Sequence, residues 1–265
     1  MSEALEEPYE ELLKALPGQW RLNVDETSHP DQGERWWTWC FRAELYILFK
    51  IEPSRSGDVL IEVLGREFAG VLGCDYFSAY RRYMRECGVV VQFCLAHLIR
   101  DVKFLTTLPD QEEQSYGERL REALRALFAV IHRRDGLTEK EFGGQLEEAR
   151  QKVLATALTD VPAGRHSQNL KKRFERHGAA YFQFITTPGV QPTNNLAEQA
   201  IRFVVIDRRI TQGTRGEGGR NWCERIWTVI ASCAEQGRSV FAYLHEAVQA
   251  YFQKTAAPSL LPLES

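Results

Sequence analysis

The chain has 265 residues, of which 44% are hydrophobic and 26% charged, and its formal net charge is −3. This is the composition of an ordinary soluble globular protein, long enough for one large domain or two small ones. No apolar run reaches the ~20 residues of a membrane-spanning helix, and the acidic start excludes a signal peptide. We therefore expect a cytoplasmic protein with no membrane partner. Six scattered cysteines indicate free thiols and not a disulfide framework.

An acidic leader over residues 1–19 precedes a region, 20–107, in which strand and helix patterns alternate. Its first strand shows the period-two alternation of a half-buried strand, and the next two are rich in aromatic and β-branched residues. A helical pattern, a short apolar strand, a second helical pattern and a last strand follow. The predicted order is β-β-β-α-β-α-β, over the stretches 20–28, 35–41, 45–51, 56–68, 68–77, 78–87 and 89–97.

The middle of the chain, residues 108–184, shows almost only helical periodicity. The second of its helices is expected to weaken or break at Gly143–Gly144. An all-helical block after a β-rich half indicates an insertion between core elements. The core then resumes over residues 185–252, with a glycine-rich stretch at 211–220 that predicts a mobile loop. Residues 253–265 are expected to form a disordered tail.

Three carboxylates stand out by position: Asp25 in the first strand, Asp75 at the end of the fourth, and Glu198 at the start of a late helix. Aspartate is depleted in strands and costly to bury unpaired, so two such sites suggest a bound cation. A sparse set of oxygen ligands suits magnesium, and two metals close together support phosphodiester chemistry.

Local structural roles remain open for each of these acids. Asp25 can be a strand-end or turn aspartate, and Asp75 can cap the following helix. With Asn195 as the N-cap, Glu198 falls at the third helical position and completes a capping box. The sequence alone does not decide between these local roles and a metal site.

Cys94 and His97 form a C-x-x-H pair. Such a pair can be half of a zinc site, although a tetrahedral site needs four ligands and no second pair has matching spacing. The competing interpretation is a buried core histidine on an apolar strand.

Two basic stretches interrupt the acidic balance. Residues 165–176 hold five Lys or Arg against one Glu, and residues 202–225 hold six Arg against three acids. Short basic stretches are usually solvated helix faces, but around one site they form a footprint for DNA phosphates. The candidate DNA-binding residues are Lys171, Lys172, Arg173, Arg208, Arg209, Arg215 and Arg220.

Several of these stretches occur together in one known family. The segments VDETSHPDQGERWWTW, GCDYFSAYRRY, FCLAHLIRDVKFL, PTNNLAEQAIRFVV and the closing GTRGEGGRNWCERIWTVIASCAEQGRSVFAYL lie in order along the chain. From about Trp20 to Phe252 the sequence resembles the DDE transposases of the insertion-sequence-sixty-six (IS66) family. Gln199 and Phe203 depart from the family's usual Arg and Pro.

The resemblance implies an α/β fold: an RNase H-like mixed sheet flanked by helices, with an all-helical insertion before the last acidic residue. It implies that Asp25, Asp75 and Glu198 are catalytic and hold two Mg²⁺ ions, for which Mn²⁺ can substitute. The substrate would be DNA, as transposon ends and target. Supporting or DNA-contacting roles fall to Cys94, His97, Asn194, Asn195 and Arg202.

The function that follows is metal-dependent DNA strand cleavage and strand transfer. Pairing two DNA ends predicts a homo-oligomer, and full-length relatives carry an N-terminal DNA-recognition region. We therefore expect a catalytic domain alone, a truncated copy or a naturally short variant, with a separately encoded N-terminal or accessory protein as a further partner. The alternatives are a non-transposing DNA-binding or regulatory remnant and another RNase H-like nuclease.

Overall fold

The computed structural model describes residues 1–262, which form two compact units. The sheet unit consists of Met1–Val91 and the chain from Asn194 onward, and the helical unit is Gln92–Thr193. The boundary falls inside the fifth strand. None of the helices within residues 1–262 combines the length and apolarity that crossing a membrane requires.

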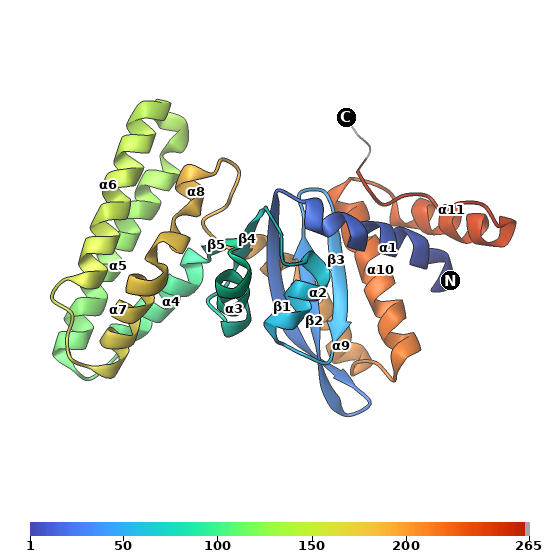
Figure 1. Cartoon of the computed structure of the whole chain (residues 1–265), viewed down its shortest axis with the longest axis horizontal. Helices are drawn as coiled ribbons and strands as arrows, with labels where there is room; N and C mark the ends of the chain where they lie inside the picture. Colours follow the sequence, from blue (N-terminus) through green and yellow to red (C-terminus); the bar gives the residue numbers. More distant parts are fainter. Residues whose placement is uncertain (263–265) are drawn as a thin grey trace. The chain divides into compact units, whose positions relative to one another are not determined.

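A mixed five-stranded sheet forms the centre of the sheet unit (Figure 1). Its strand order is β3-β2-β1-β4-β5, with β1 antiparallel to β2, β2 antiparallel to β3, and β1 parallel to β4. This is the topology of an RNase H-like core, and it confirms the predicted α/β class and order of elements. The strands are β1 (Arg21–Asp31), β2 (Glu34–Arg42), β3 (Ile47–Glu52), β4 (Val71–Cys74) and β5 (Val90–Phe93).

Helices cover both faces of this sheet. On one face, buried side chains of α9 and α10 pack with Cys40, Phe49 and Ile51 into an apolar cluster. On the other face, Tyr80 of α3 packs edge-on against Trp39 of β2. The helices of the sheet unit are η1 (Glu3–Leu5), α1 (Glu6–Ala15), η2 (Leu16–Gly18), α2 (Gly57–Leu64), α3 (Ser78–Cys87), α9 (Asn195–Thr211), α10 (Glu217–Glu235) and α11 (Val240–Gln253).

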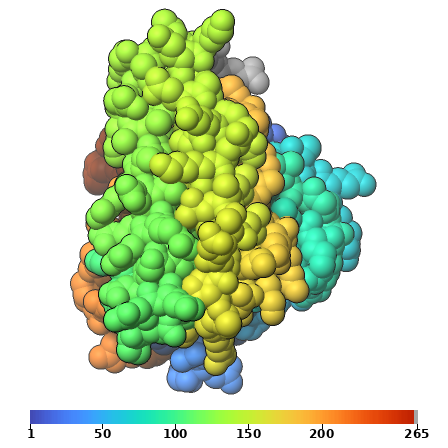
Figure 2. Space-filling view, turned by 90° about the vertical axis from the view of Figure 1, so that its left-hand side faces the viewer, coloured from blue at the N-terminus to red at the C-terminus, as the bar shows by residue number. Residues whose placement is uncertain are grey.

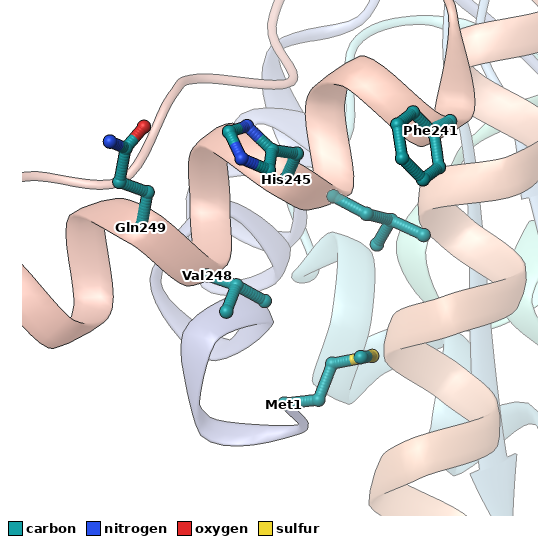
Figure 3. Close-up of a pocket in the computed structure, with 6 residues that line it drawn as sticks. Met1, Phe241, His245, Val248 and Gln249 are labelled. Atoms are coloured by element: carbon teal, nitrogen blue, oxygen red, sulfur yellow. The ribbon is translucent and has the colours of Figure 1, made fainter.

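Both ends of the described chain pack against the sheet unit. In the acidic leader, Leu5 and Leu12 are fully buried, and Tyr9 donates a hydrogen bond to the carbonyl of Phe49 in β3. At the other end, the structure differs from the expected disordered tail as far as residue 262, because Leu260 is fully buried. The last part of that prediction, residues 263–265, lies outside the described residues. A pocket of about 380 Å³ lies between Met1 and α11 (Figure 3).

The helical unit is an α-helical bundle. Helices α5 and α6 pack side by side along most of their length and, with α7, cover the face seen in Figure 2. Glu113 of α5 caps α7 from outside, because its Oε1 accepts from the backbone N–H groups of His166 and Ser167. The helices are α4 (Leu95–Leu105), α5 (Gln111–His132), η3 (Arg134–Gly136), α6 (Glu139–Leu158), α7 (Arg165–His177), η4 (Gly178–Tyr181) and α8 (Gln183–Thr186).

Two details of this unit differ from the sequence prediction. The unit begins at Gln92 and ends at Thr193, so it is wider than the predicted 108–184, because α4 packs on α5. Helix α6 also runs unbroken through Gly143–Gly144. A complete capping box between Thr138 and Glu141 starts this helix and compensates for part of the glycine penalty.

The edge of the sheet formed by β3 is covered by side chains of α10. Ser232, Thr228 and Glu224 lie four residues apart along the helix and accept hydrogen bonds from the N–H groups of Ile47, Phe49 and Ile51, at 3.1, 3.0 and 2.5 Å. An edge strand otherwise leaves these donors open to pairing with another chain. We call this row of contacts the edge ladder.

The edge ladder makes the stability of the protein depend on pH. Burial raises the pKa of Glu224 from 4.5 to about 7, so the folded protein holds a proton that the unfolded chain releases. Folding stability should therefore fall as pH rises from about 4.5 to about 7. Glu224→Gln keeps the acceptor oxygen and removes the ionisation. Its urea midpoint relative to the unsubstituted protein should rise across this window and stay constant outside it; a constant difference throughout would contradict the assignment.

Candidate active site

The three carboxylates singled out in the sequence all lie in the sheet unit. Asp25 is in the middle of β1, Asp75 directly follows β4, and Glu198 lies in the first turn of α9. The pKa of Asp25 is raised from 3.8 to about 7, first by burial, then by the negative charge of Glu26, and less by the charges of Asp75 and Glu198. The three groups are therefore close enough to interact electrostatically.

The spacing of these acids is looser than that of ligands around a single ion. Among residues 1–262, Asp25, Asp75 and Glu198 do not form a group whose oxygens all lie within 4.8 Å of one another. Like charges repel and disfavour closer approach unless a cation lies between them. Two-metal sites also spread their ligands over ions roughly 3.5–4 Å apart, so no single oxygen cluster is required.

The first turn of α9 is fixed to β1 by two side-chain amides. Asn23 Nδ2 donates to Asn194 Oδ1 at 2.9 Å, and Asn194 Nδ2 donates to the carbonyl of Val24 at 2.9 Å. Gly73 of β4 lies opposite Asn23, where an added Cβ would approach Asn23 Nδ2 to 2.5 Å. Glycine at this position leaves room for the amide pair next to Asp25.

This arrangement corrects the predicted start of α9. The N-cap is Asn194 and not Asn195, and its side chain makes no capping hydrogen bond because it faces β1 instead. Glu198 is consequently the fourth residue of the helix, outside the position that a capping box requires. The capping-box interpretation of Glu198 is wrong.

Asp75 is likewise not the cap of the helix that follows it. The N-cap of α3 is Phe77, and Asp75 Oδ1 accepts from the backbone N–H of Phe77 at 2.8 Å in a local turn. One carboxylate oxygen thus holds the turn after β4. Asp25 is similar, since its Oδ1 accepts from the N–H of Glu26 at 3.0 Å.

A fourth acid, Glu26, escaped the sequence analysis. It is only 7% exposed, accepts a hydrogen bond from the hydroxyl of Tyr80, and forms an ion pair with Arg55 at 2.6 Å. The Arg55 guanidinium also lies over the rings of Trp37 and Phe77. Burial raises the pKa of Glu26 despite these partners. Strand periodicity contained the signal, because Glu26 shares the face of Leu22 and Val24.

The end of β1 holds the turn between α9 and α10 through a buried polar network. Thr214 Oγ1 donates to Asp31 Oδ1 at 2.8 Å and contacts His29 Nε2 at 2.9 Å. His29 Nδ1 in turn contacts Thr38 Oγ1 at 3.1 Å. Burial lowers the pKa of His29 to about 4, and the neutral ring donates from Nε2 and accepts at Nδ1 in this arrangement. We call this network the β1 clamp; it ties down the turn that we had expected to be mobile.

The candidate DNA-binding residues of the sheet unit fall into two groups. Arg220 pairs with buried Asp31 and lies 3.9 Å over the Trp36 ring, and Arg208 donates to Thr27 Oγ1 at 2.7 Å. These two arginines are engaged by the fold. The second group, the exposed arginines of the basic stretch 202–225, consists of Arg202, Arg209 and Arg215.

The basic stretch of the helical unit divides similarly. Arg173 pairs with Asp101 at 2.7 Å and donates to the hydroxyl of Tyr181. Lys171 lies 3.9 Å from Glu175 in the same helix, whereas Lys172 is exposed. Lys172 therefore keeps the greatest freedom to meet a ligand.

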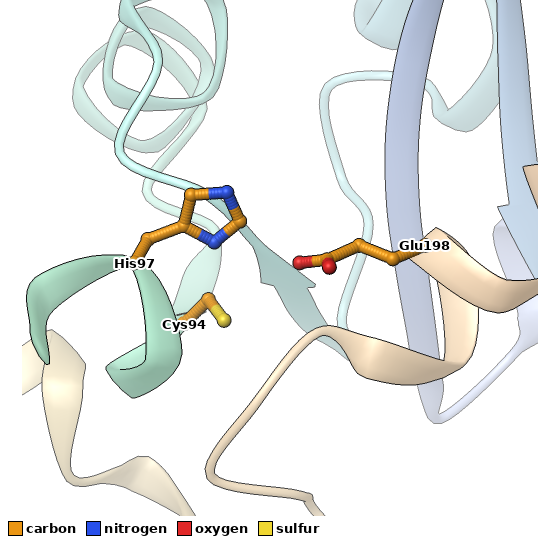
Figure 4. Close-up of side chains that lie close together, drawn as sticks. All are labelled: Cys94, His97 and Glu198. Carbon is orange, nitrogen blue, oxygen red and sulfur yellow. The ribbon is translucent and has the colours of Figure 1, made fainter. Parts of the chain in front are cut away.

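Cys94 and His97 lie at the start of α4 in the helical unit. Cys94 is the buried N-cap residue and His97 is half-buried one turn later. Figure 4 shows both projecting from this first turn, and Glu198 projecting from α9. Within residues 1–262, no four His, Cys, Asp or Glu ligand atoms come within 4.8 Å of one another, so the half zinc site finds no complete tetrahedral set.

Comparisons with known proteins bear on this site. The family model described as Transposase IS66 family matches residues 1–221. The comparison with curated proteins gave no match. A solved structure of the HTLV-2 integrase catalytic core domain in complex with magnesium, in a dimeric form, is 9% identical with a TM-score of 0.23, covering 58% of this chain and 96% of that one. The family model spans most of the chain, including β1, β4 and the start of α9, and the chain therefore belongs to the Transposase IS66 family.

Proposed function

We propose that the chain is the catalytic part of a transposase, and that Asp25, Asp75 and Glu198 form its active site for DNA strand cleavage and strand transfer. The observation that carries this proposal is the placement of the three acids, in the middle of β1, directly after β4 and in the first turn of α9, close enough that Asp75 and Glu198 add to the effect of burial and of Glu26 in raising the pKa of Asp25. A buried carboxylate whose pKa is shifted by specific neighbouring charges is a candidate for a functional site. Membership of a transposase family agrees with this chemistry.

The donor set fits a hard divalent cation such as Mg²⁺. Three carboxylates offer only oxygen ligands, which Mg²⁺ prefers in small number because it retains several waters and takes further ligands from phosphate. Burial raises the pKa of Asp25 most and repulsion from neighbouring acids adds to it, and a bound cation would offset both by favouring the charged carboxylate. When bound, two such ions supply Lewis-acid stabilisation of the attacking and leaving oxygens.

The remaining residues of the site would position these acids and the DNA. Asn194 would hold Glu198 at its place relative to Asp25, because it ties the start of α9 to the carbonyl of Val24. Arg202, Arg209 and Arg215 would contact phosphates, which fix the register of DNA without reading its sequence. Two DNA ends brought together would require a second copy of the chain.

The role of Glu198 is tested by Glu198→Gln, a change that keeps the size of the side chain and removes its charge. Magnesium-dependent nicking of a DNA substrate should fall by more than about 100-fold, the upper end of what loss of a supporting partner costs a metal site. The thermal midpoint without metal should stay the same or rise, because one repelling charge leaves the acid group.

Glu217→Gln is the matched control, since Glu217 is an exposed glutamate in the first turn of another helix, α10. This variant should nick DNA at the normal rate. Unchanged nicking in Glu198→Gln would remove Glu198 from the active site. Normal nicking by the unsubstituted chain without any joined product, on substrates carrying transposon ends, would favour a nuclease over a transposase.

Asn194→Ala tests the positioning of α9. The change leaves the Val24 carbonyl and the Asn23 amide without their partner, which should cost about 1–3 kcal/mol of unfolding free energy and also slow nicking. Asn195→Ala is the control for stability, because Asn195 is exposed in the next position; its urea midpoint should match that of the unsubstituted protein. Equal urea midpoints for the two variants would show that the amide pair does not hold the helix.

The DNA contact is tested by salt dependence. Arg209→Ala combined with Arg215→Ala should reduce the slope of log affinity against log salt by about 0.9 for each lost phosphate contact. Arg125→Ala removes one exposed positive charge from α5, outside both basic stretches, and should leave the slope unchanged. A double variant with the original slope would exclude this surface from DNA binding.

A further inference from the structure

Helix α11 has three distinct faces, although a helix on a protein surface normally has two. Tyr243, Ala247 and Ala250 are buried against the sheet unit. Glu246, Gln249 and Gln253 are exposed on a polar face. The third face is apolar, with two half-buried side chains at its centre and an exposed one at each end. Its members follow the helical spacing i, i+3, i+7, i+11 and are Phe241, Leu244, Val248 and Phe252. We call this face the α11 stripe.

The two ends of the α11 stripe are unusually open for side chains of this kind. Phe241 is 81% exposed and Phe252 is 78% exposed. Contiguous apolar surface on a soluble protein commonly marks a site of interaction. The chain after α11 is held on other surfaces. Tyr243, on the buried face of α11, donates a hydrogen bond to the carbonyl of Pro258, and Gln236, the C-cap of α10, donates one to the carbonyl of Leu260.

A pocket lies along this stripe. It has a volume of about 380 Å³ and is lined by Met1 on one side and by Phe241, Leu244, His245, Val248 and Gln249 of α11 on the other. Figure 3 shows Met1 and Val248 facing the same space. The pocket gives the stripe a groove into which a side chain of a partner can insert, as at the centre of protein interfaces.

The shape of the stripe fits a helical partner. From Phe241 to Phe252 it extends about 16 Å along the axis, the length of three helical turns. A row of side chains at spacings of three and four residues packs into the grooves of an opposing helix. A strand has no matching set of open backbone groups on this face, because α11 satisfies its own.

The charge beside the pocket indicates which kind of partner helix can bind there. Met1, which lines the pocket opposite α11, belongs to a segment, residues 1–11, with five glutamates and neither Lys nor Arg. The N-terminal ammonium of Met1 pairs with Glu3 and Arg225 pairs with Glu6, and the exposed Glu7 and Glu246 leave the surroundings net negative. A second copy of the chain would bring an equally acidic wall to the same groove, where like charges repel. A partner with basic side chains beside its apolar stripe is favoured instead.

We propose that the α11 stripe and its pocket are a docking site for an amphipathic helix of another protein, with Lys or Arg flanking its apolar stripe. The site is separate from the proposed strand-transfer chemistry, so its failure and the failure of that chemistry are distinguishable. Apolar insertion supplies affinity, and the acidic leader supplies selectivity for the basic flank.

The test is fluorescence anisotropy of the full chain with a labelled synthetic helical peptide. The peptide carries Leu at the a and d positions of a heptad repeat and Lys at the flanking e and g positions. A second peptide has Glu in place of every Lys. The Lys peptide should bind, and its affinity should fall as the salt concentration rises. Its affinity should exceed that of the Glu peptide by about tenfold or more, a difference of ~1.4 kcal/mol.

Variants locate the site. Phe241→Ser with Phe252→Ser should weaken binding of the Lys peptide about tenfold or more, whereas Ala242→Ser and Gln253→Ser, on the polar side, should not. Thermal midpoints of all variants should agree, because Phe241 and Phe252 are largely exposed. Equal binding of the double variant would overturn the proposal, as would no preference between peptides. Self-association that the double variant abolishes would assign the stripe to a second copy.

Discussion

The amide side chain of Asn194 controls how the two halves of the sheet unit meet. It accepts a hydrogen bond from Asn23 and donates one to the Val24 carbonyl. These partners precede Asn194 by 171 and 170 positions in the sequence, and the entire helical unit lies between them along the chain. Each bond is ordinary in length, but both are shielded from water, since Asn194 is 1% exposed. A shielded polar group must keep its partners or lose about 1–3 kcal/mol. The chain can therefore accommodate a large helical insertion without losing the register between β1 and α9.

The β1 clamp secures the other end of the same helix. Asn194 fixes the N-terminal end of α9, and Thr214, three residues after its end, is bonded to Asp31 at the last position of β1. Helix and strand are thus attached at both ends, with Asp25 between the attachments. This arrangement explains why so much polar hydrogen bonding is buried around one strand, and why Arg220 serves the fold while Arg209 and Arg215 remain at the surface.

Periodicity and motif order predicted the fold class, the order of elements and the positions of the three acids, because those features are local or come in sequence order. The start of α9 was missed because the best capping residue nearby, Asn194, has its side chain engaged by a strand 170 residues away. The glycine-rich turn was misjudged for the same reason, as its anchor, Asp31, is remote in sequence. Glu26 was overlooked because local patterns do not reveal that Arg55 and Tyr80 converge on it.

The edge ladder has a geometric consequence for the shape of the sheet unit. Four helical residues advance about 6.0 Å, while two strand residues advance about 6.6–6.8 Å, so each successive contact drifts by about 0.7 Å. The hydroxyl oxygens of Ser232 and Thr228 have the same reach, whereas the carboxylate of Glu224 reaches two bonds further. The longer side chain at the Ile51 end lets the row continue where the two repeats no longer match. The backbone N–H groups of these three strand residues are therefore occupied, and no strand of another molecule can extend the sheet along them.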